Sequence, residues 1–287
     1  MRAFLRFRLV TVLIGCAAMA EGGLLYAQAP AAKAEQKLPR PLTRYKGRTI
    51  APTMTYHGAD WLVRQNREQE EHCQTLLEAL KLKPGDVVCD MGCGNGFYTL
   101  PIAKLVGEKG RVLAVDIQPE MLHMLDLRAK DAKIENVEPI QGTVIDPKLP
   151  AGEVDLILLV DVYHEFAYPE QMLKAMRAAL KPTGRVALVE FRLEDPDVPI
   201  KLEHKMTKKQ IMKEFPPNGF KLVDEYEELP WQHVMFFGRD DADAADDGEA
   251  PKESTKKPAR RPARGANGKE NHENAKERKH ETKRKDE

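Results

Sequence analysis

The sequence lacks the cysteine patterns and the long apolar run that would mark a disulfide scaffold, a zinc site or a membrane-spanning helix. It has only four cysteines in 287 residues. Beyond Cys16 these are Cys73, Cys89 and Cys93, an odd number that builds no disulfide framework, and "CDMGC" is not a CxxC pair. We therefore predict no metal site. The apolar run at 9–20 is shorter than the roughly 20 residues that cross a bilayer, so no integral membrane domain is expected.

The chain also lacks net charge, but this balance hides an asymmetry near the C-terminus. Residues 240–250 form an acidic run, and the basic segment that follows is almost free of large apolar side chains. Such a segment buries too little apolar surface to offset its ordering entropy, so residues 240–287 are predicted to be a disordered charged tail. Two interpretations stay open: a weak contact between its basic part and a polyanion, or a solvated tail without a partner.

Residues 1–29 have the pattern of a signal peptide or lipoprotein signal, with arginines before a short apolar run. Three cleavage points compete: after "AMA", after "AQA", or at Cys16, where "LIGC" resembles a bacterial lipobox. We therefore expect an exported protein, periplasmic or lipoprotein-anchored, and a cytoplasmic one if the signal is misread. Residues 30–54 are rich in Ala, Pro and Lys without periodicity, which predicts a linker.

Residues 55–239 alternate apolar runs with helical patterns and form the predicted folded domain. Near-continuous runs of Val, Ile and Leu are typical of parallel strands covered on both faces. Pro119 and Pro169 begin two of the helical patterns. This alternation predicts a Rossmann-like, doubly wound α/β sheet, closed by two final strands, 220–229 and 232–238, as an antiparallel edge. The earlier candidate strands lie at 86–91, 111–117, 137–142, 154–161 and 184–191.

A glycine loop follows the first of these strands, in "GDVVCDMGCGNGFYTL". Asp90 ends the strand, three alternating glycines follow, and the next strand ends in Asp116, placed to accept hydrogen bonds from ribose hydroxyls. A dinucleotide loop would have its third glycine at Phe97, and Asp90 would repel a pyrophosphate. Asp90 suits a cationic amino-acid group instead, so the pattern favours S-adenosylmethionine over NAD. The alternative is a tight strand–helix turn without a ligand.

With these motifs, residues 56–237 resemble a class I S-adenosylmethionine-dependent methyltransferase. "VVCDMGCGNGFYT", "VLAVDIQPEML", "VDLILLVDVYHEF" and "LKPTGRVALVEF" resemble four family motifs in the family's order. The resemblance implies a seven-stranded sheet whose last strand is antiparallel. It also implies that the glycine loop and Asp90 meet the methionine part of the cofactor and that Asp116 meets the ribose.

One departure from the family pattern concerns the adenine. Many members have an acid just past a glycine after the third strand, whereas here Thr143 follows Gly142 and the nearest acid is Asp146. The adenine contact therefore stays open. The cofactor-binding residues that we expect are Asp90, Gly92, Gly94, Gly96, Asp116, Ile117, Thr143, Asp146 and Asp161.

The segment "DVYHEF" follows the fourth strand and is the predicted place of chemistry. Methyl transfer needs an aligned nucleophile and, for a protonated acceptor, a base. His164 is the first candidate for that base, and Glu165 is the second catalytic candidate; the alternative is that His164 only packs against the next helix. Trp61 and His204 have equally plain interpretations, as a packing residue and a surface histidine. The expected substrate contacts are Tyr163, His204, Tyr56 and Trp61.

These features predict an S-adenosylmethionine-dependent methyltransferase (EC 2.1.1.-) that acts on an unidentified small molecule. Two alternatives stay open. One is an exported, catalytically inactive binding protein with the same fold, and the other is a nucleic-acid methyltransferase assisted by the tail. The folded part has no "NPPY"-type motif of the kind used to methylate base amino groups.

Overall fold

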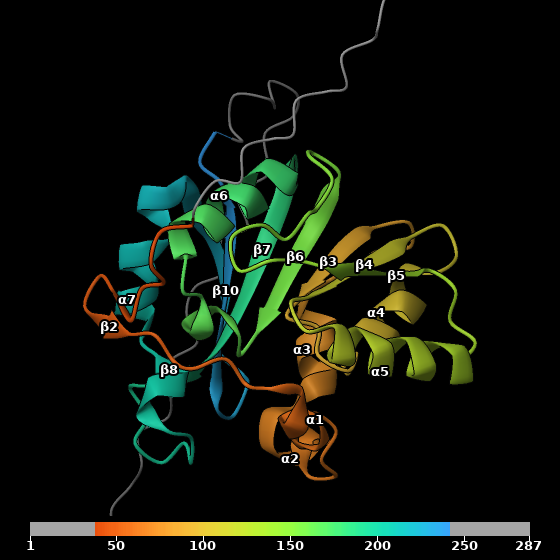
Figure 1. The fold of residues 1–287 in the computed structure, drawn as a ribbon, viewed down its shortest axis with the longest axis horizontal. Coiled ribbons are helices and arrows are strands. Elements are labelled where there is room, and N and C mark those ends of the chain that lie inside the picture. Colours follow the sequence, from red (N-terminus) through yellow and green to blue (C-terminus); the bar gives the residue numbers. More distant parts are fainter. Residues whose placement is uncertain (1–37, 242–287) are drawn as a thin grey trace, which may run out of the picture.

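The computed structural model describes residues 38–241 of the chain (Figure 1). The predicted export signal and the predicted tail beyond Asp241 lie outside the described residues. Within the described part of the chain, no helix has the length and apolarity of a membrane span.

The centre of the molecule is a mostly parallel sheet, with strands in the order β5-β4-β3-β6-β7-β10-β9 and β8 paired with the end of β7. The first five of these strands are parallel, and β10 is antiparallel to both β7 and β9. This confirms the Rossmann-like prediction, including the antiparallel last strand. The strands are β3 (Val87–Met91), β4 (Arg111–Asp116), β5 (Val137–Gln141), β6 (Val154–Val160), β7 (Leu180–Arg192), β8 (Lys205–Met206), β9 (Phe220–Tyr226) and β10 (Gln232–Arg239).

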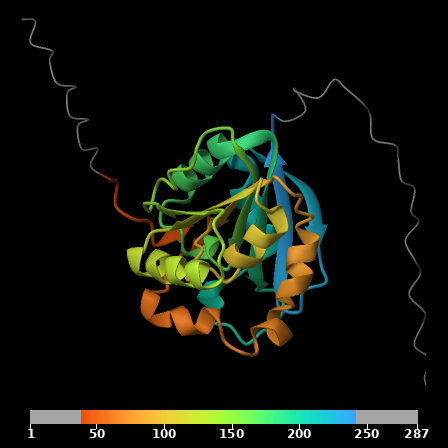
Figure 2. The same ribbon diagram turned by 90° about the vertical axis from the view of Figure 1, so that its right-hand side faces the viewer.

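Helices cover both faces of the sheet, which Figure 2 shows from the side. Side chains of α3 and α4 pack on one face together with Leu156 and Leu158 of β6, and α5 joins them over Ala114. Side chains of α6 and α7 pack on the other face with Ile157 and Leu159. Alternate residues of one strand thus enter opposite cores, as strand geometry requires. The helices are α1 (Ala59–Leu62), α2 (Arg67–Glu71), α3 (Cys73–Ala79), α4 (Thr99–Val106), α5 (Pro119–Asp131), α6 (Pro169–Ala179) and α7 (Lys208–Glu214).

The segment before α1 corrects the linker prediction over residues 38–54. It forms a hairpin of β1 (Arg44–Tyr45) and β2 (Arg48–Thr49), joined by Lys46 and Gly47 with φ of 44° and 102°. Two positive φ values in a two-residue turn suit the right-handed twist of the strands. Tyr45 is 6% exposed, so the hairpin is packed onto the domain rather than extended from it.

The start of the predicted tail is also bound to the fold. Asp240 accepts a hydrogen bond from Arg177 of α6 at 2.6 Å, and its backbone N–H donates to the carbonyl of Gly219. Asp241 pairs with Arg239 at 2.8 Å. The folded domain therefore extends two residues past the predicted boundary at 239.

Candidate active site

Acidic residues end or follow four neighbouring strands at the carboxyl edge of the sheet. Asp116 is the last residue of β4, and Asp90 is the last but one of β3. Asp161 directly follows β6, and Glu190 lies near the end of β7. Because parallel strands share one carboxyl edge, these side chains gather there, where open α/β sheets bind ligands. Figure 1 shows α1 and α2 just beyond this edge of the sheet.

The glycine loop after β3 has a backbone that other residues do not adopt readily. Gly92, Gly94 and Gly96 have φ of 74°, 53° and 85°. A Cβ at Gly92 would lie 2.5 Å from Val162, and one at Gly94 would lie 2.5 Å from Leu62 of α1. The loop therefore needs glycine for both its dihedral angles and its close contacts.

Asp116 fixes this loop from the neighbouring strand. Its Oδ2 accepts a hydrogen bond from the Gly94 N–H at 3.0 Å, and its Oδ1 accepts one from the Gln118 N–H at 2.9 Å. A carboxylate offers about four acceptor positions, so these hydrogen bonds leave room for a further donor. Burial raises the pKa of Asp116, and the backbone hydrogen bonds from Gln118 and Gly94 oppose that rise.

Asp90 is buried beneath the loop, with 4% of its surface exposed. Its Oδ2 accepts a hydrogen bond from the Thr99 hydroxyl at 2.6 Å. Burial raises the pKa of Asp90 to about 6, although the Thr99 hydroxyl opposes this. A positive group beside this carboxyl would favour its ionised form.

Two buried acceptor atoms near the end of β6 have no hydrogen-bond partner: Oδ1 of Asp161 and Oε1 of Gln232. Gln232 donates through Nε2 to Oδ2 of Asp161 and to Glu71 of α2, each at 3.1 Å. Asp161 has a φ of 52°, which is rare for a residue with a side chain. Buried acceptors without a donor are costly, so this place suits a ligand that brings N–H groups.

The short helices α1 and α2 are tied to this cluster and cover the glycine loop. Asn95 donates from its side chain to the carbonyl of Ala59 at 3.0 Å. The buried Arg67 pairs with Glu71 at 3.0 Å and donates to the carbonyl of Leu62 at 2.8 Å. These contacts hold Leu62 of α1 over Gly94.

A second cluster of polar side chains lies around the 3-10 turn η2 (Tyr163–Glu165), which follows shortly after the end of β6. His164 is 2% exposed, and its Nδ1 lies 2.6 Å from Oε2 of Glu190. Its backbone N–H donates to the other carboxylate oxygen of Glu190 at 3.1 Å. Its Nε2 lies 3.0 Å from Nδ1 of His204, which ends the turn η3 (Leu202–His204). The structure thus brings the predicted His164 and His204 together.

The charges around this cluster set the protonation of its members. Burial alone would lower the pKa of His164, but the adjacent Glu190 carboxylate more than offsets this, so the pKa is raised. Burial and the neighbouring His164 lower the pKa of His204. Burial raises the pKa of Glu165 to about 7, although His164 opposes the rise.

The hairpin segment holds η2 in place through its backbone. The carbonyl of His164 accepts hydrogen bonds from the Ala51 N–H at 3.1 Å and from Arg48 at 2.8 Å. Oε1 of Glu165 accepts one from the Met54 N–H at 3.1 Å. Residues assigned to a linker from sequence thus position both predicted catalytic side chains.

The predicted substrate contacts Tyr163, Trp61 and Tyr56 lie in three different environments. Tyr163 is not a substrate contact, because it is fully buried in the core and its hydroxyl donates to Glu214 at 2.8 Å. Trp61 is 48% exposed and packs its ring against the Arg64 guanidinium, 3.8 Å away. Tyr56 is half-buried, and its backbone N–H donates to Gln118 at 2.8 Å.

The loop after β5 closes on itself. The Thr143 hydroxyl accepts a hydrogen bond from the Asp146 N–H at 3.0 Å, and Asp146 accepts one from the Lys148 N–H at 2.8 Å. Both side chains are exposed, and Ile117 is 37% exposed at the end of β4. The Gly142 N–H donates to the carbonyl of Asp116, so this turn lies beside the predicted ribose site.

Three polar residues of the site were missed from sequence: Glu190, Glu71 and Gln232. Glu190 carried a usable signal, because it is a lone acid near the end of the apolar run "RVALVEF". Glu71 and Gln232 had no such signal in the sequence, because each lies among other polar residues and reaches the site only when the chain is folded.

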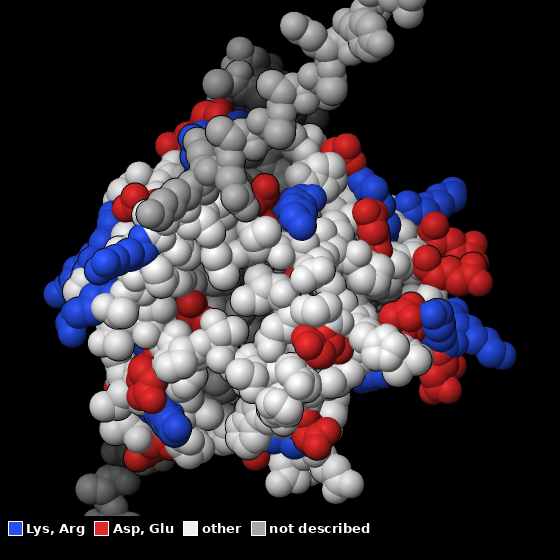
Figure 3. Space-filling model, viewed as in Figure 1, with Lys and Arg blue, Asp and Glu red and all other residues white. Residues whose placement is uncertain are grey.

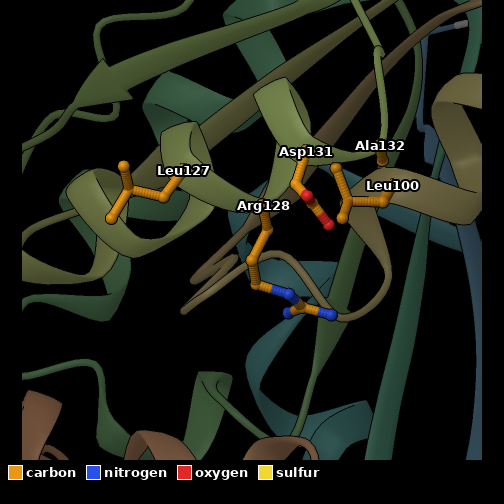
Figure 4. Close-up of a pocket in the computed structure, with 5 residues that line it drawn as sticks. All are labelled: Leu100, Leu127, Arg128, Asp131 and Ala132. Carbon is orange, nitrogen blue, oxygen red and sulfur yellow. The ribbon is translucent and has the colours of Figure 1, made fainter.

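A surface hollow of about 370 Å³ lies away from this site, against α4 and α5 (Figure 4). It is lined by Leu100, Leu127, Arg128, Asp131 and Ala132 and shares no residue with either cluster. Arg128 donates to the carbonyl of Asn95 at 2.7 Å, so it supports the glycine loop from outside.

Comparison with known proteins supports this fold and shows the family. A family model described as a methyltransferase domain matches residues 82–243, more than half of the chain. The chain belongs to the class I S-adenosylmethionine-dependent methyltransferases. The crystal structure of a SAM-dependent methyltransferase from Aquifex aeolicus has the same fold, with a TM-score of 0.61 at 24% identity. The match covers 64% of this chain and 98% of that one.

Two curated relatives of this methyltransferase have names that refer to quinones. It is 30% identical over 166 residues to the demethylmenaquinone methyltransferase of Lactobacillus johnsonii, covering 56% of this chain and 66% of that protein. It is 32% identical over 110 residues to the ubiquinone/menaquinone biosynthesis C-methyltransferase UbiE of Vibrio vulnificus, covering 38% of this chain and 42% of that protein. The chain spans less than two thirds of the length of either relative.

The cofactor of this family is S-adenosylmethionine, and the residues present fit it. The partnerless oxygens of Asp161 and Gln232 suit the amino group of its methionine part, which only donates hydrogen bonds. The remaining acceptor positions of Asp116 suit its ribose hydroxyls, and the glycine loop lets the chain pass close to it. When bound, the cofactor supplies a methyl group on a sulfonium, whose sulfur keeps the electron pair of the broken bond.

Proposed function

We propose that this methyltransferase methylates a ring carbon of a small hydroxylated aromatic acceptor of the quinol class. The observation that supports this most is the pairing of His164 with Glu190 and His204, one turn beyond Asp161 of the cofactor site. The acceptor class is supported by the names of the two curated relatives.

The chemistry of a quinol explains why such a cluster is needed. A ring carbon becomes nucleophilic when the neighbouring hydroxyl loses its proton, because the negative charge spreads into the ring. His164, His204 and Glu165 supply nitrogen and carboxylate bases that take the proton of that hydroxyl. The carbon then forms the new C–C bond, and its own proton leaves when the ring regains aromaticity.

The surface on the face seen in Figure 1 is consistent with a small neutral acceptor. Lys and Arg gather toward its edges, and the middle is largely uncharged (Figure 3). On this face the described residues form no continuous basic band, so it offers no support for a nucleic-acid substrate.

The test is methyl transfer from tritiated S-adenosylmethionine to 2-prenyl-1,4-naphthoquinol by the full chain. We expect label in the extracted naphthoquinol, and we expect calorimetric binding of the cofactor without acceptor. Asp116→Ala should weaken that binding about tenfold or more, since a hydrogen bond to a charged group contributes roughly 1.5–3 kcal/mol. Asp126→Ala is the matched control, because Asp126 is a partly exposed acid that pairs, within the described residues, with Lys130 on α5.

Two outcomes would contradict the proposal in different ways. Cofactor binding without transfer to the naphthoquinol would refute the acceptor class and favour the binding-protein alternative. Absence of cofactor binding would refute the enzymatic function itself.

A further inference from the structure

The second cluster of the site has the composition and spacing of a metal centre. We propose that His164, His204 and Glu165 bind a divalent transition-metal ion such as Zn²⁺ on the acceptor side of the active site. The cysteine pattern of the sequence predicted no metal site, whereas this cluster consists of histidines and a carboxylate.

The three ligand atoms are already close together. One atom each from His164, Glu165 and His204 lies within 4.8 Å of the others. Nε2 of His164 and Nδ1 of His204 are 3.0 Å apart. Two nitrogens bound tetrahedrally to zinc at about 2.0–2.1 Å lie about 3.3 Å apart, so the two histidines need to move by only a few tenths of an ångström to bind the ion. A carboxylate oxygen of Glu165 lies within 4.8 Å of a ring nitrogen of each histidine and completes the set by a change of side-chain rotamer.

Glu190 prepares His164 for this role. It is fully buried, and it binds the Nδ1 atom and the backbone N–H of the same histidine. A carboxylate at Nδ1 holds the proton there and leaves the Nε2 lone pair free for a cation. Histidines that ligate metals usually have such a carboxylate or carbonyl on their other nitrogen, which orients the ring and raises its basicity.

The charge balance also favours a cation between the two rings. Two carboxylates, Glu165 and Glu190, lie next to His164, and one of them directly contacts its ring. Oε1 of Glu165 accepts only the Met54 N–H among the described contacts. A divalent ion between the rings gains the Glu165 carboxylate as a ligand and leaves Glu190 in its place.

The site is accessible and incomplete, as catalytic metal sites are. His164 is buried, but Glu165 and His204 are only half-buried, so an ion reaches the cluster from their side. Three protein ligands leave a coordination position for an acceptor oxygen, whose pKa the ion lowers. That role rests on the proposed function, whereas metal binding itself does not.

The test is Zn²⁺ titration of the full chain after treatment with a chelator, read by competition with a metal-binding dye. We expect one tight site per chain, weakened at least tenfold in His204→Ala and also weakened in Glu165→Gln. Co²⁺ should give visible ligand-field bands with the wild type that His204→Ala loses. His204 lies on a short, partly exposed turn, so this variant should keep the far-ultraviolet circular dichroism of the wild type.

Two control variants separate this site from other histidines. His123→Ala removes an exposed histidine on α5, and a His272→Ala/His280→Ala double variant removes those of the C-terminal segment. Both should keep the tight site. The proposal is overturned if the wild type binds Zn²⁺ no more tightly than His204→Ala does, or if either control loses the site. In that case Glu190, His164 and His204 form a metal-free proton relay.

The outcome is separate from that of the proposed function. Cofactor binding is measured in chelator, so its loss would say nothing about the metal. A tight Zn²⁺ site with no methylation of the naphthoquinol would refute the acceptor class and leave the metal proposal intact.

Discussion

Asp90 shows how a single buried carboxyl links stability to pH. Its folded pKa of about 6 lies above the ordinary 3.8 because burial disfavours the charged form. The protonated acid therefore stabilises the fold fully below about pH 4, and this contribution is lost as the pH rises through 6. Asp90→Asn cannot ionise. We expect it to be more stable than the wild type above pH 6, by about 2–3 kcal/mol, and to bind the cofactor more weakly.

The measurement is urea unfolding of the cofactor-free chain at pH 4.5, 6 and 8, with Asp126→Asn as the control. The gap between Asp90→Asn and the wild type should widen with pH, while the control should show no such trend. A gap that stays constant over this range would mean that Asp90 is not the group that titrates.

The role of a single residue was predictable from sequence where its position at the end of a strand determined that role. Asp90 and Asp116 each end an apolar run, so a parallel sheet places them at one edge. Tyr163 was misplaced because η2 is a 3-10 turn, in which neither the strand nor the α-helix period tells which side chain enters the core. Its hydroxyl partner, Glu214, lies 51 residues away in sequence.

Two glycines on either side of β3, Gly85 before it and Gly96 after it, allow a comparison between two kinds of strain. Gly96 and Gly85 both have positive φ, at 85° and 96°. A Cβ at Gly96 would lie 2.3 Å from the buried Leu125, whereas one at Gly85 would have nothing within 4 Å. Both alanine variants carry a backbone penalty of about 1–2 kcal/mol. Gly96→Ala should lose about 1–3 kcal/mol more, because it also overpacks the core.

Equilibrium unfolding of Gly96→Ala and Gly85→Ala at one pH measures that difference. Equal losses of stability in the two variants would show that Leu125 moves away freely, and that the dihedral angle alone requires glycine at position 96.

The N-terminal hairpin should contribute to stability through one buried ion pair. Arg48 contacts Glu214 at 2.8 Å, and the Glu214 side chain is fully buried. Arg48→Ala leaves that carboxylate without its cation, so we expect a loss of about 3 kcal/mol in the free energy of unfolding. Arg44→Ala is the control within the same hairpin, because Arg44 is exposed and donates only to Gly47. Thermal denaturation that finds the two variants equally stable would contradict this role.

Whole elements were predictable in proportion to their length. The seven long strands and the helices α4, α5 and α6 follow their apolar patterns to within a few residues. The hairpin was missed because strands of two residues have no periodicity. It is held by contacts with η2 and α7, more than 100 residues away in sequence.

At the scale of the whole molecule, the rate at which the buried thiols react with a reagent measures how the domain unfolds. Cys73, Cys89 and Cys93 are buried, and burial raises the pKa of each thiol. In a Cys16→Ser background we expect Cys89 and Cys93 to react with a thiol reagent only as fast as the domain unfolds globally, and saturating cofactor should slow them. Mass spectrometry after timed labelling identifies each site. Early modification of Cys93 would instead show that the glycine loop opens locally.

The overall architecture was predictable because alternating strands and helices leave few topologies. The way the two clusters of the active site come together was not predictable from sequence, because η2, η3, the hairpin and the end of β7 meet only in the folded chain. No local pattern encodes contacts between segments so far apart.

The place of β10 between β7 and β9 has a consequence for the order in which the chain is made. β7 obtains its second long neighbour only when residues 232–238 have left the ribosome, because β10 is the last strand of the described domain. Until then one side of β7 exposes unpaired backbone groups, and β9 has no partner in the sheet. A nascent chain of this topology completes its fold only after nearly all of the domain has been synthesised. Chaperones that bind nascent chains therefore meet the domain while this edge of the sheet is still unpaired.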